Sequence, residues 1–238
     1  MNRASSDGFF ATTRWTRVVA AQETSGSALG ELCAAYYAPV HAYIVGTAHD
    51  LGDPRDLTQE FFARLLRGSM IHGADRTKGR FRNYLLGAVK HFLADMHDRR
   101  RAAKRGAQYE HITLAPDTDT SPGIDIPDLR LSDAWFDREW GIAVLTLALE
   151  TLAREHTAPD KQTHFHVLKP WLTGDANQAD AAARLGISEG AVKVAIHRLR
   201  KRFRECVKTE IAQTVATDAE ARDELRYLIE VVTSSHGT

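Results

Sequence analysis

The sequence predicts an all-α protein with two helical domains joined by an acidic flexible linker, the C-terminal domain carrying a helix-turn-helix. Apolar residues recur every three or four positions along most of the chain, which is the period of an amphipathic helix, and no segment shows the alternation of a strand. This period stops in residues 107–131, which contain three Pro, one Gly and mostly acidic charge. The expected units are a helical domain over 9–106, the linker over 107–131, a helix-turn-helix domain over 132–208 and a helical extension over 209–238.

Composition places the chain among ordinary globular proteins. Its 238 residues are 43% hydrophobic, which is enough for one or two buried cores. No run approaches the roughly 18 to 20 apolar residues of a membrane span, and the N-terminus lacks the apolar core of a signal peptide, so we expect a cytoplasmic protein with no membrane segment. Cys33 and Cys206 lie far apart without CxxC spacing, so neither a disulfide framework nor a thiolate zinc site is expected.

The net charge of zero hides strongly segregated blocks of charge. Residues 76–105 hold ten Lys or Arg against two Asp, and residues 107–160 hold eleven Asp or Glu against three Arg. Residues 178–208 return to eight basic against three acidic residues, and the tail from residue 209 holds six acidic against two basic residues. Two basic modules separated by an acidic connector predict two separate contacts with a polyanion such as nucleic acid.

The first two helices are expected in the N-terminal domain. In residues 28–48, an apolar stripe at helical spacing is interrupted by Pro39, which removes a backbone donor and predicts a kink or a division of the helix. The next helix begins with Asp53 as its N-cap and Pro54 in its first turn, and it ends at Gly68. The side of this helix opposite its apolar side carries Asp56, Gln59, Glu60 and Ala63.

A polar, basic loop and a long amphipathic helix follow. Residues 72–80 form the loop, and apolar residues then recur at helical period from Phe81 to Met96, ahead of arginines at 99–101. Polar or cationic residues on or beside the other side of this helix are Arg80, Arg82, Asn83, Lys90, His91, Arg99 and Arg100. Such a segment can contact single-stranded nucleic acid. On its own it fits a solvated basic helix end equally well.

The C-terminal domain is predicted to begin with Ser132 as an N-cap. A helix then runs through Leu152, and a further helix has its apolar residues between Phe165 and Leu172. The chain closes with an amphipathic helix over residues 219–232. The first two of these helices are expected to build the small core on which the helix-turn-helix rests.

The helix-turn-helix lies in residues 178–204. A first helix over 178–185 ends at Gly186, where the turn needs a positive φ angle, and Ser188 caps the second helix. In the second helix an apolar stripe lies beside a basic stripe, and residues 190–204 contain six Lys or Arg and no carboxylate. This charge suits a helix in a DNA major groove. The plainer alternative is a solvated basic face on a structural helix pair.

Three segments, in this order, resemble bacterial RNA polymerase sigma factors of the sigma-70 family, in the extracytoplasmic-function (ECF) subgroup. They are DLTQEFFARLL at 56–66, KGRFRNYLLGAVKHFLADMHDRRR at 78–101 and the helix-turn-helix at 178–204. The resemblance covers nearly the whole chain, and three segments in family order are more specific than any one of them. It implies a non-enzymatic subunit, without a cofactor, that binds core RNA polymerase and directs promoter-specific transcription initiation.

The resemblance also implies roles for individual residues. Asp56, Gln59, Glu60 and Ala63 match positions that dock on the β′ clamp helices of the polymerase. The positions that capture flipped bases of the minus-10 element are matched by Arg80, Arg82, Asn83, Lys90, His91, Arg99 and Arg100. The positions that read the minus-35 element are matched by Ser188, Glu189, Gly190, Lys193, Val194, His197, Arg198, Arg200, Lys201 and Arg204. The partners implied are promoter DNA and core polymerase, at its β flap as well as its clamp helices.

The chain departs from the family at the start of the polymerase-binding helix. The family has an acidic cluster of the form DAED there, whereas this chain has Asp53, Pro54, Arg55 and Asp56, so that one carboxylate is replaced by Arg55. We hypothesise that phosphorylation of Thr58 by a Ser/Thr kinase restores the negative charge and switches the factor on. An unmodified Thr58 is the plainer alternative, and an anti-sigma factor is another means of control.

Two other functions fit parts of the sequence. A stand-alone helix-turn-helix repressor or activator would use the N-terminal domain for dimerisation or ligand binding, and it would not need the second basic segment at 78–101. A metal-dependent hydrolase would use Asp50, Asp53, Asp56 and Glu60. No set of His or Cys ligands accompanies these carboxylates, so no metal site is expected.

Overall fold

The computed structural model describes residues 26–67, 80–108, 126–174 and 176–234, and within these ranges the chain is all-α, with eight α-helices and no strand. The helices, joined by one 3-10 helix (η3), are α2 (Gly26–Thr47), α3 (Pro54–Leu66), α4 (Phe81–Gln108), α5 (Ile126–Arg154), α6 (Pro159–Leu168), η3 (Lys169–Leu172), α7 (Gln178–Leu185), α8 (Glu189–Ala212) and α9 (Asp218–Ser234). None of the described helices is both long and apolar enough to cross a membrane.

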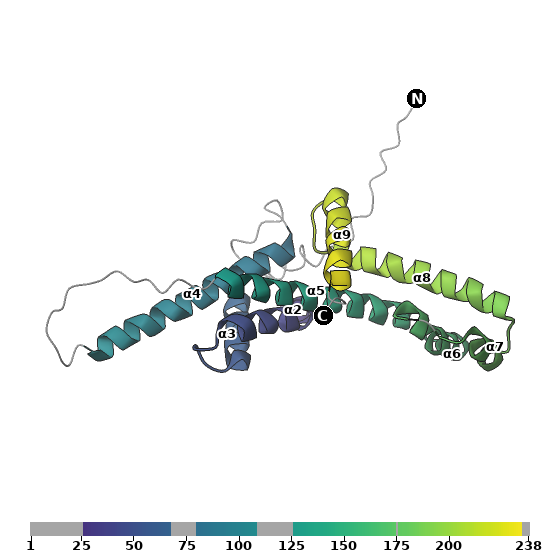
Figure 1. Cartoon of the computed structure of the whole chain (residues 1–238), viewed down its shortest axis with the longest axis horizontal. Helices are drawn as coiled ribbons and strands as arrows, with labels where there is room; N and C mark the ends of the chain where they lie inside the picture. Colours follow the sequence, from purple (N-terminus) through teal and green to yellow (C-terminus); the bar gives the residue numbers. More distant parts are fainter. Residues whose placement is uncertain (1–25, 68–79, 109–125, 175, 235–238) are drawn as a thin grey trace, which may run out of the picture.

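The molecule is elongated, and α5 runs through its middle (Figure 1). The helices α2, α3 and α4 lie at one end, and α6, α7 and the start of α8 lie at the other. Helix α5 packs most extensively against α2, and it also packs against α8 and α9. It therefore connects the two predicted domains as a shared structural element.

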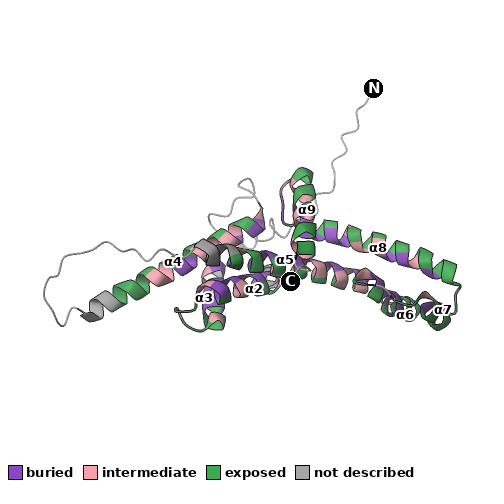
Figure 2. Cartoon of the chain, viewed as in Figure 1, coloured by how far each residue is buried: buried purple, intermediate pink, exposed green. Residues whose placement is uncertain are grey.

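Close approach of α2 and α5 depends on Gly46. A Cβ atom placed on Gly46 would lie 2.6 Å from Ser132 Oγ and 2.8 Å from the Trp135 ring, so a larger residue would push the helices apart. Buried residues along this contact and its neighbours form one hydrophobic cluster, which includes Tyr43 of α2, Phe61 of α3 and Trp140 of α5. Figure 2 shows this buried side of each helix facing its neighbours. The boundaries of the two predicted domains stay a prediction.

Several predicted helix ends are confirmed. The Asp53 side chain caps α3 by accepting a hydrogen bond from the Arg55 backbone N–H at 2.7 Å, and Pro54 occupies the first turn. Helix α7 covers the predicted residues 178–185, and Ser188 caps α8. The final helix starts with a capping box, because Thr217 Oγ1 accepts from the Glu220 N–H at 3.2 Å and Glu220 Oε2 accepts from the Thr217 N–H at 3.1 Å.

Two parts of the predicted secondary structure differ in the structure. Of the kink or division predicted at Pro39, division is excluded, because α2 is continuous through Pro39. Pro39 is buried beside Tyr36 and Val40, and the tertiary packing of this stretch outweighs the lost backbone hydrogen bond. Helix α5 begins at Ile126 and not after Ser132, because Pro127 is compatible with a first helical turn, so residues 126–131 of the expected linker are helical.

Two further helix ends differ slightly from the prediction. Helix α3 ends at Leu66, with Arg67 as C-cap, two residues before the expected Gly68. Helix α4 continues to Gln108, past the expected end of the N-terminal domain. The remainder of the expected linker, most of the loop at 72–80 and residues 9–25 of the first domain lie outside the described residues.

Candidate nucleic-acid interface

The pair α7 and α8 is joined by a turn whose geometry follows from three residues. Asn177 caps α7 by accepting hydrogen bonds from the N–H groups of Ala179 (2.9 Å) and Asp180 (3.5 Å). Gly186 ends α7 in the left-handed conformation, with φ 65° and ψ 29°. Ser188 Oγ then accepts from the Ala191 N–H at 3.2 Å and opens α8. The turn therefore positions the N-terminal end of α8 without support from distant residues.

Helix α8 buries one stripe and exposes a cationic one. Val192, Ile196 and Leu199 are buried, as the helical period predicts. The exposed residues are Lys193, Val194, His197, Arg198, Lys201 and Arg204. Val194 is 51% exposed, so an apolar side chain lies among these cations, where it can contact a thymine methyl group. Ser188, Glu189 and Gly190 are also exposed at the N-terminal end of the helix.

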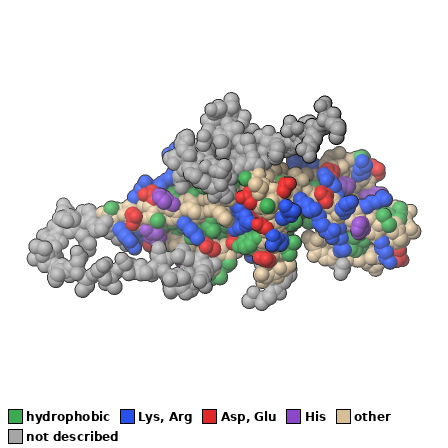
Figure 3. Space-filling model, turned by 90° about the horizontal axis from the view of Figure 1, so that it is seen from above, with side chains coloured by type: hydrophobic (Ala, Val, Ile, Leu, Met, Phe, Trp, Pro, Cys, Tyr) green, Lys and Arg blue, Asp and Glu red, His purple; other side chains and the backbone are tan. Residues whose placement is uncertain are grey.

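The cationic side chains of α8 gather on the surface. In Figure 3, Lys and Arg side chains gather over the half of the molecule that α8 occupies. No Asp or Glu of α8 lies between Gly190 and Arg204 to interrupt them. An array of this kind can neutralise phosphates on both sides of a DNA groove.

Arg200 differs from its neighbours because its guanidinium points towards the protein. It is half-buried, and its Nε donates a hydrogen bond to the Trp171 carbonyl oxygen at 2.9 Å. Trp171 is the buried residue of η3. The predicted role of Arg200 in reading DNA is therefore accompanied by a structural role, which is to hold η3 against α8.

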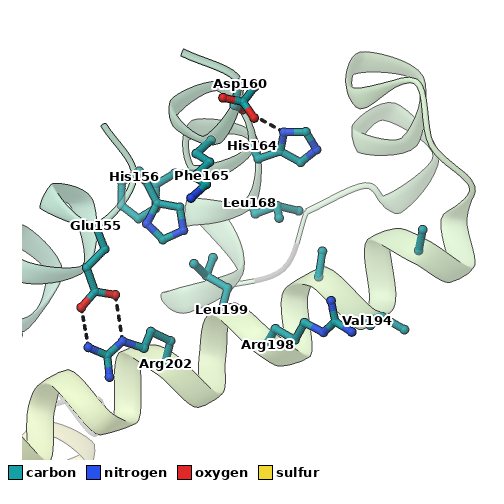
Figure 4. Close-up of a pocket in the computed structure, with 13 residues that line it drawn as sticks. Glu155, His156, Asp160, His164, Phe165, Leu168, Val194, Arg198, Leu199 and Arg202 are labelled. Carbon is teal, nitrogen blue, oxygen red and sulfur yellow. Dashed lines mark hydrogen bonds and ion pairs between the residues drawn. The ribbon is translucent and has the colours of Figure 1, made fainter. Parts of the chain in front are cut away.

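A groove of about 850 Å³ runs between α8 and α6 (Figure 4), and it borders the exposed surface of α8. Its floor is apolar, with Phe165 and Leu168 facing Leu199. Arg198 lines the groove beside Val194. At one end Arg202 donates two hydrogen bonds to the Glu155 carboxylate, and these bonds lower the pKa of Glu155. The ion pair therefore holds α8 at one end of the groove, while Arg198 lies between the groove and the exposed cationic surface.

The second predicted DNA-contact set begins at the N-terminal end of α4, where Arg82 is buried. Its Nε donates to Glu224 Oε1 of α9 at 2.9 Å, and its Nη1 forms an ion pair with Asp137 of α5. The guanidinium also lies over two rings, 4.9 Å from the Trp140 centroid and 4.4 Å from the Tyr227 centroid. Burial works against its charge, but the hydrogen bond and negative charge of Glu224, with Asp137, outweigh it and raise the pKa of Arg82. Arg82 is not on the surface where the prediction placed it.

Two more cations of this set are paired. Arg80 Nη1 lies 2.9 Å from Glu224 Oε2, and Arg80 Nη2 lies 3.7 Å from Asp223 Oδ2. Lys90 Nζ donates to Asp133 Oδ2 of α5 at 2.8 Å. Carboxylates of α9 therefore pair with Arg80 just before α4, and a carboxylate of α5 pairs with Lys90 further along the helix.

The other four residues of the α4 set are exposed. Asn83 and His91 face solvent. Arg99 lies 3.0 Å from Asp95, and Arg100 lies 3.6 Å from Asp50, in ion pairs whose partners are all well exposed. Exposed pairs of this kind hold their members weakly, so both arginines remain accessible to a phosphate.

The predicted polymerase-binding residues share one surface of α3. Asp56 and Gln59 are exposed, and Glu60 and Ala63 are half-buried beside them. Glu60 forms an ion pair with Arg64, whose Nη1 also donates to Asp95 Oδ2 of α4 at 3.1 Å. The carboxylate of Glu60 is therefore oriented by the same arginine that links α3 to α4.

Thr58 is 0% exposed. Its hydroxyl donates to the Pro54 carbonyl oxygen at 2.6 Å and lies 3.2 Å from His41 Nδ1 of α2. A kinase cannot reach this hydroxyl in the present conformation, and a phosphate attached there would lie in the core. The structure therefore gives no support to Thr58 as a modification site.

Sequence reasoning missed the residues that enclose Arg82, namely Asp137, Trp140, Glu224 and Tyr227. Tyr227 donates a hydrogen bond to Asp137, and burial together with this carboxylate raises the pKa of Tyr227 to about 12. The available signal was the charge segregation itself, since acidic blocks next to basic blocks can pair within one chain as readily as they can separate two contacts with a polyanion.

Comparison with known proteins adds no family or relative: no protein-family model, no curated protein and no solved structure matches the chain. Across the ranges that the structure describes, no group of three or more His, Cys, Asp or Glu side chains is arranged to hold a metal ion. The candidate site therefore rests on the geometry of α7, α8 and α4.

Proposed function

We propose that the protein is an ECF-type sigma factor, a non-enzymatic subunit that binds core RNA polymerase and directs promoter-specific transcription initiation. The observation that carries the proposal is the pair of helices α7 and α8, joined at a left-handed Gly186, with exposed Lys193, His197 and Arg198 on the second helix; we interpret this pair as the helix-turn-helix. In this function α8 reads the minus-35 element in duplex DNA. The exposed surface of α3 around Asp56 docks on the β′ clamp helices, and α4 contacts the minus-10 element.

Support for the proposal comes from the combination of three surfaces on one chain. A repressor accounts for α8 alone, whereas a sigma factor also accounts for the exposed surface of α3 around Asp56 and for the arginine-rich end of α4. Exposed Asn83, His91, Arg99 and Arg100 remain candidates for the minus-10 contact.

A stand-alone helix-turn-helix regulator is the second candidate, and one observation favours it. The cations Arg80, Arg82 and Lys90 pair with carboxylates of the same chain, which weakens the argument that α4 exists to bind DNA. In that function the N-terminal helices would serve dimerisation or ligand binding.

Gel filtration with purified core polymerase, followed by run-off transcription, separates the two candidates. A sigma factor co-elutes with the core enzyme and supports initiation from specific promoters. Glu60→Ala should weaken co-elution, because it removes a carboxylate from the docking surface, while Arg64 keeps Asp95 as a partner and holds α3 to α4. Glu230→Ala, at an exposed carboxylate of α9, is the matched control. Failure to co-elute, together with tight binding of a palindromic duplex as a dimer, would favour the second candidate.

A further inference from the structure

The C-terminal helix α9 covers the cations at the start of α4. Figure 1 shows the N-terminal end of α4 beside α9, although the two are remote in the sequence. Arg82 and Glu224 are 142 residues apart and hydrogen-bonded at 2.9 Å. The backbone contributes as well, because the Phe81 N–H donates to the Thr214 carbonyl oxygen at 3.2 Å. The segment after α8 therefore contacts α4 through both side chains and backbone.

The anionic groups in this contact resemble the phosphates that the cations would otherwise bind. Glu224 offers one oxygen to Arg82 and the other to Arg80, and Asp223 extends the negative charge towards solvent. A phosphodiester can accept the same hydrogen bond from Arg82 and form the same ion pair with Arg80. While α9 is in place, a nucleic-acid strand and these carboxylates compete for the same two arginines.

We infer that α9 is an intramolecular inhibitor of the α4 nucleic-acid contact, a clasp in which Glu224 takes the place of DNA phosphate on Arg80 and Arg82. The clasp rests on the proposed function, since it presumes that α4 contacts a separated promoter strand. It gives α4 two states, one closed by α9 and one open to single-stranded DNA.

The energetics suit a reversible contact. A buried ion pair contributes little net stability, because the cost of removing both charges from water offsets most of their attraction. Replacing Glu224 by a phosphate exchanges one anionic partner for another and leaves no charge unpaired. An anionic strand can therefore take the place of the carboxylate without leaving a buried arginine unpaired.

Helix α9 can remain helical when it separates from α4. The capping box of Thr217 and Glu220 closes its first turn locally, without help from α4. Its main apolar contact is with α5 at Gly141, where a Cβ atom would lie 3.2 Å from Leu228 Cδ1 and 3.3 Å from Val232 Cγ2. Separation of α9 from α4 therefore requires no unfolding of α9 itself.

The first test measures binding of a fluorescein-labelled single-stranded DNA of mixed sequence to the full chain, by anisotropy at several salt concentrations. Glu224→Gln should bind about tenfold more tightly than the wild type at low salt, and its salt slope should be steeper by about 0.7 for each arginine released. Glu230→Gln removes the same charge from an exposed position of α9 and should stay near the wild-type affinity. Adding Arg82→Gln to Glu224→Gln should reverse most of the gain. Equal affinities of Glu224→Gln and Glu230→Gln would overturn the clasp.

A second measurement needs no substitution, and it decides the question even where Glu224→Gln fails to fold. Hydrogen exchange of the wild-type chain is compared with and without the same single-stranded DNA. Because strand binding and α9 binding exclude each other, DNA should accelerate exchange of the backbone amides of α9. Unchanged or slower exchange in α9 at saturating DNA would overturn the clasp.

The two proposals fail in different experiments. If the clasp proposal is wrong, Glu224→Gln and Glu230→Gln bind the strand equally, while polymerase co-elution and run-off transcription are still observed. If the sigma-factor proposal is wrong, the protein does not co-elute with core polymerase. A strand-binding gain by Glu224→Gln would then still support the clasp, as a device of another nucleic-acid-binding protein.

Discussion

At the scale of single residues, the environment decides whether an arginine can read DNA. Arg82, Arg198 and Arg200 are alike in the sequence, each on a basic stripe of a helix. Arg198 is exposed, Arg200 donates to the Trp171 carbonyl oxygen, and Arg82 is buried between two carboxylates. The three residues should therefore respond differently to substitution.

Arg198→Ala should abolish promoter-specific transcription and leave polymerase binding intact, because the side chain is exposed on α8 and far from α3. Loss of one phosphate contact should also lower the salt slope of duplex binding by about one unit. Run-off transcription and filter binding measure the two effects. Arg184→Ala, at an exposed position of α7, is the matched control and should retain both activities. If Arg198→Ala kept wild-type transcription and duplex binding, the assignment of this surface of α8 to DNA binding would be wrong.

The raised pKa of Tyr227 should make the stability of the folded protein depend on pH. Its pKa is raised to about 12 by burial and by its hydrogen bond to Asp137, against an ordinary value of about 10. The folded state therefore favours the neutral phenol, and this contribution to stability is complete below about pH 10 and is lost as the pH rises through about 12.

Between these two pH values the free energy of unfolding should fall more steeply for the wild type than for Tyr227→Phe. Urea unfolding at a series of alkaline pH values provides the comparison. Parallel curves for the two proteins would show that Tyr227 titrates normally.

At the scale of elements, local signals account for most helix ends. The residues Asp53, Asn177 and Ser188 each cap the helix that follows them. Local signals failed for the start of α5 and for Pro39, because a proline is tolerated in a first turn and because packing of α2 against α5 compensates for a missing hydrogen bond. Caps and turns can be predicted from a few neighbouring residues, but the extent of a helix also depends on what it packs against.

Two glycine substitutions should have opposite effects on stability. Gly186→Ala places a side chain on a backbone with φ 65° and should destabilise the protein by about 1 to 2 kcal/mol. Gly87→Ala lies inside α4 with no atom within 4 Å of the added Cβ, and it should stabilise the protein by about 1 kcal/mol or less. Thermal or urea unfolding of both variants tests the pair. If both variants lost stability, the loss in Gly186→Ala could not be assigned to the left-handed conformation of Gly186.

At the scale of the whole molecule, α5 joins the two ends through one buried cluster. Residues from α2, α5 and α8 belong to the same cluster, so neither end has a core that is complete without α5. A shared cluster of this kind predicts that the two ends unfold together.

Calorimetry should therefore show one unfolding transition, with equal calorimetric and van't Hoff enthalpies. Trp140→Ala, in the middle of α5, should shift this single transition to lower temperature by removing a fully buried ring, at a cost of about 3 to 5 kcal/mol. Two resolved transitions, of which Trp140→Ala shifts only one, would show that the ends fold independently.

The all-α class, most of the helices, the caps at Asp53 and Ser188 and the cationic stripe of α8 could be predicted, because they depend on period and on residues close in the chain. The exposure of each cation could not be predicted, because it depends on residues far away in the chain. The partners of Arg82 are 55 and 142 residues away, and Thr58 is buried by the packing of α2 on α3. A charge pattern records how many ionic groups a segment carries, but pairing depends on which distant helices meet, and that is set by the burial of their apolar sides.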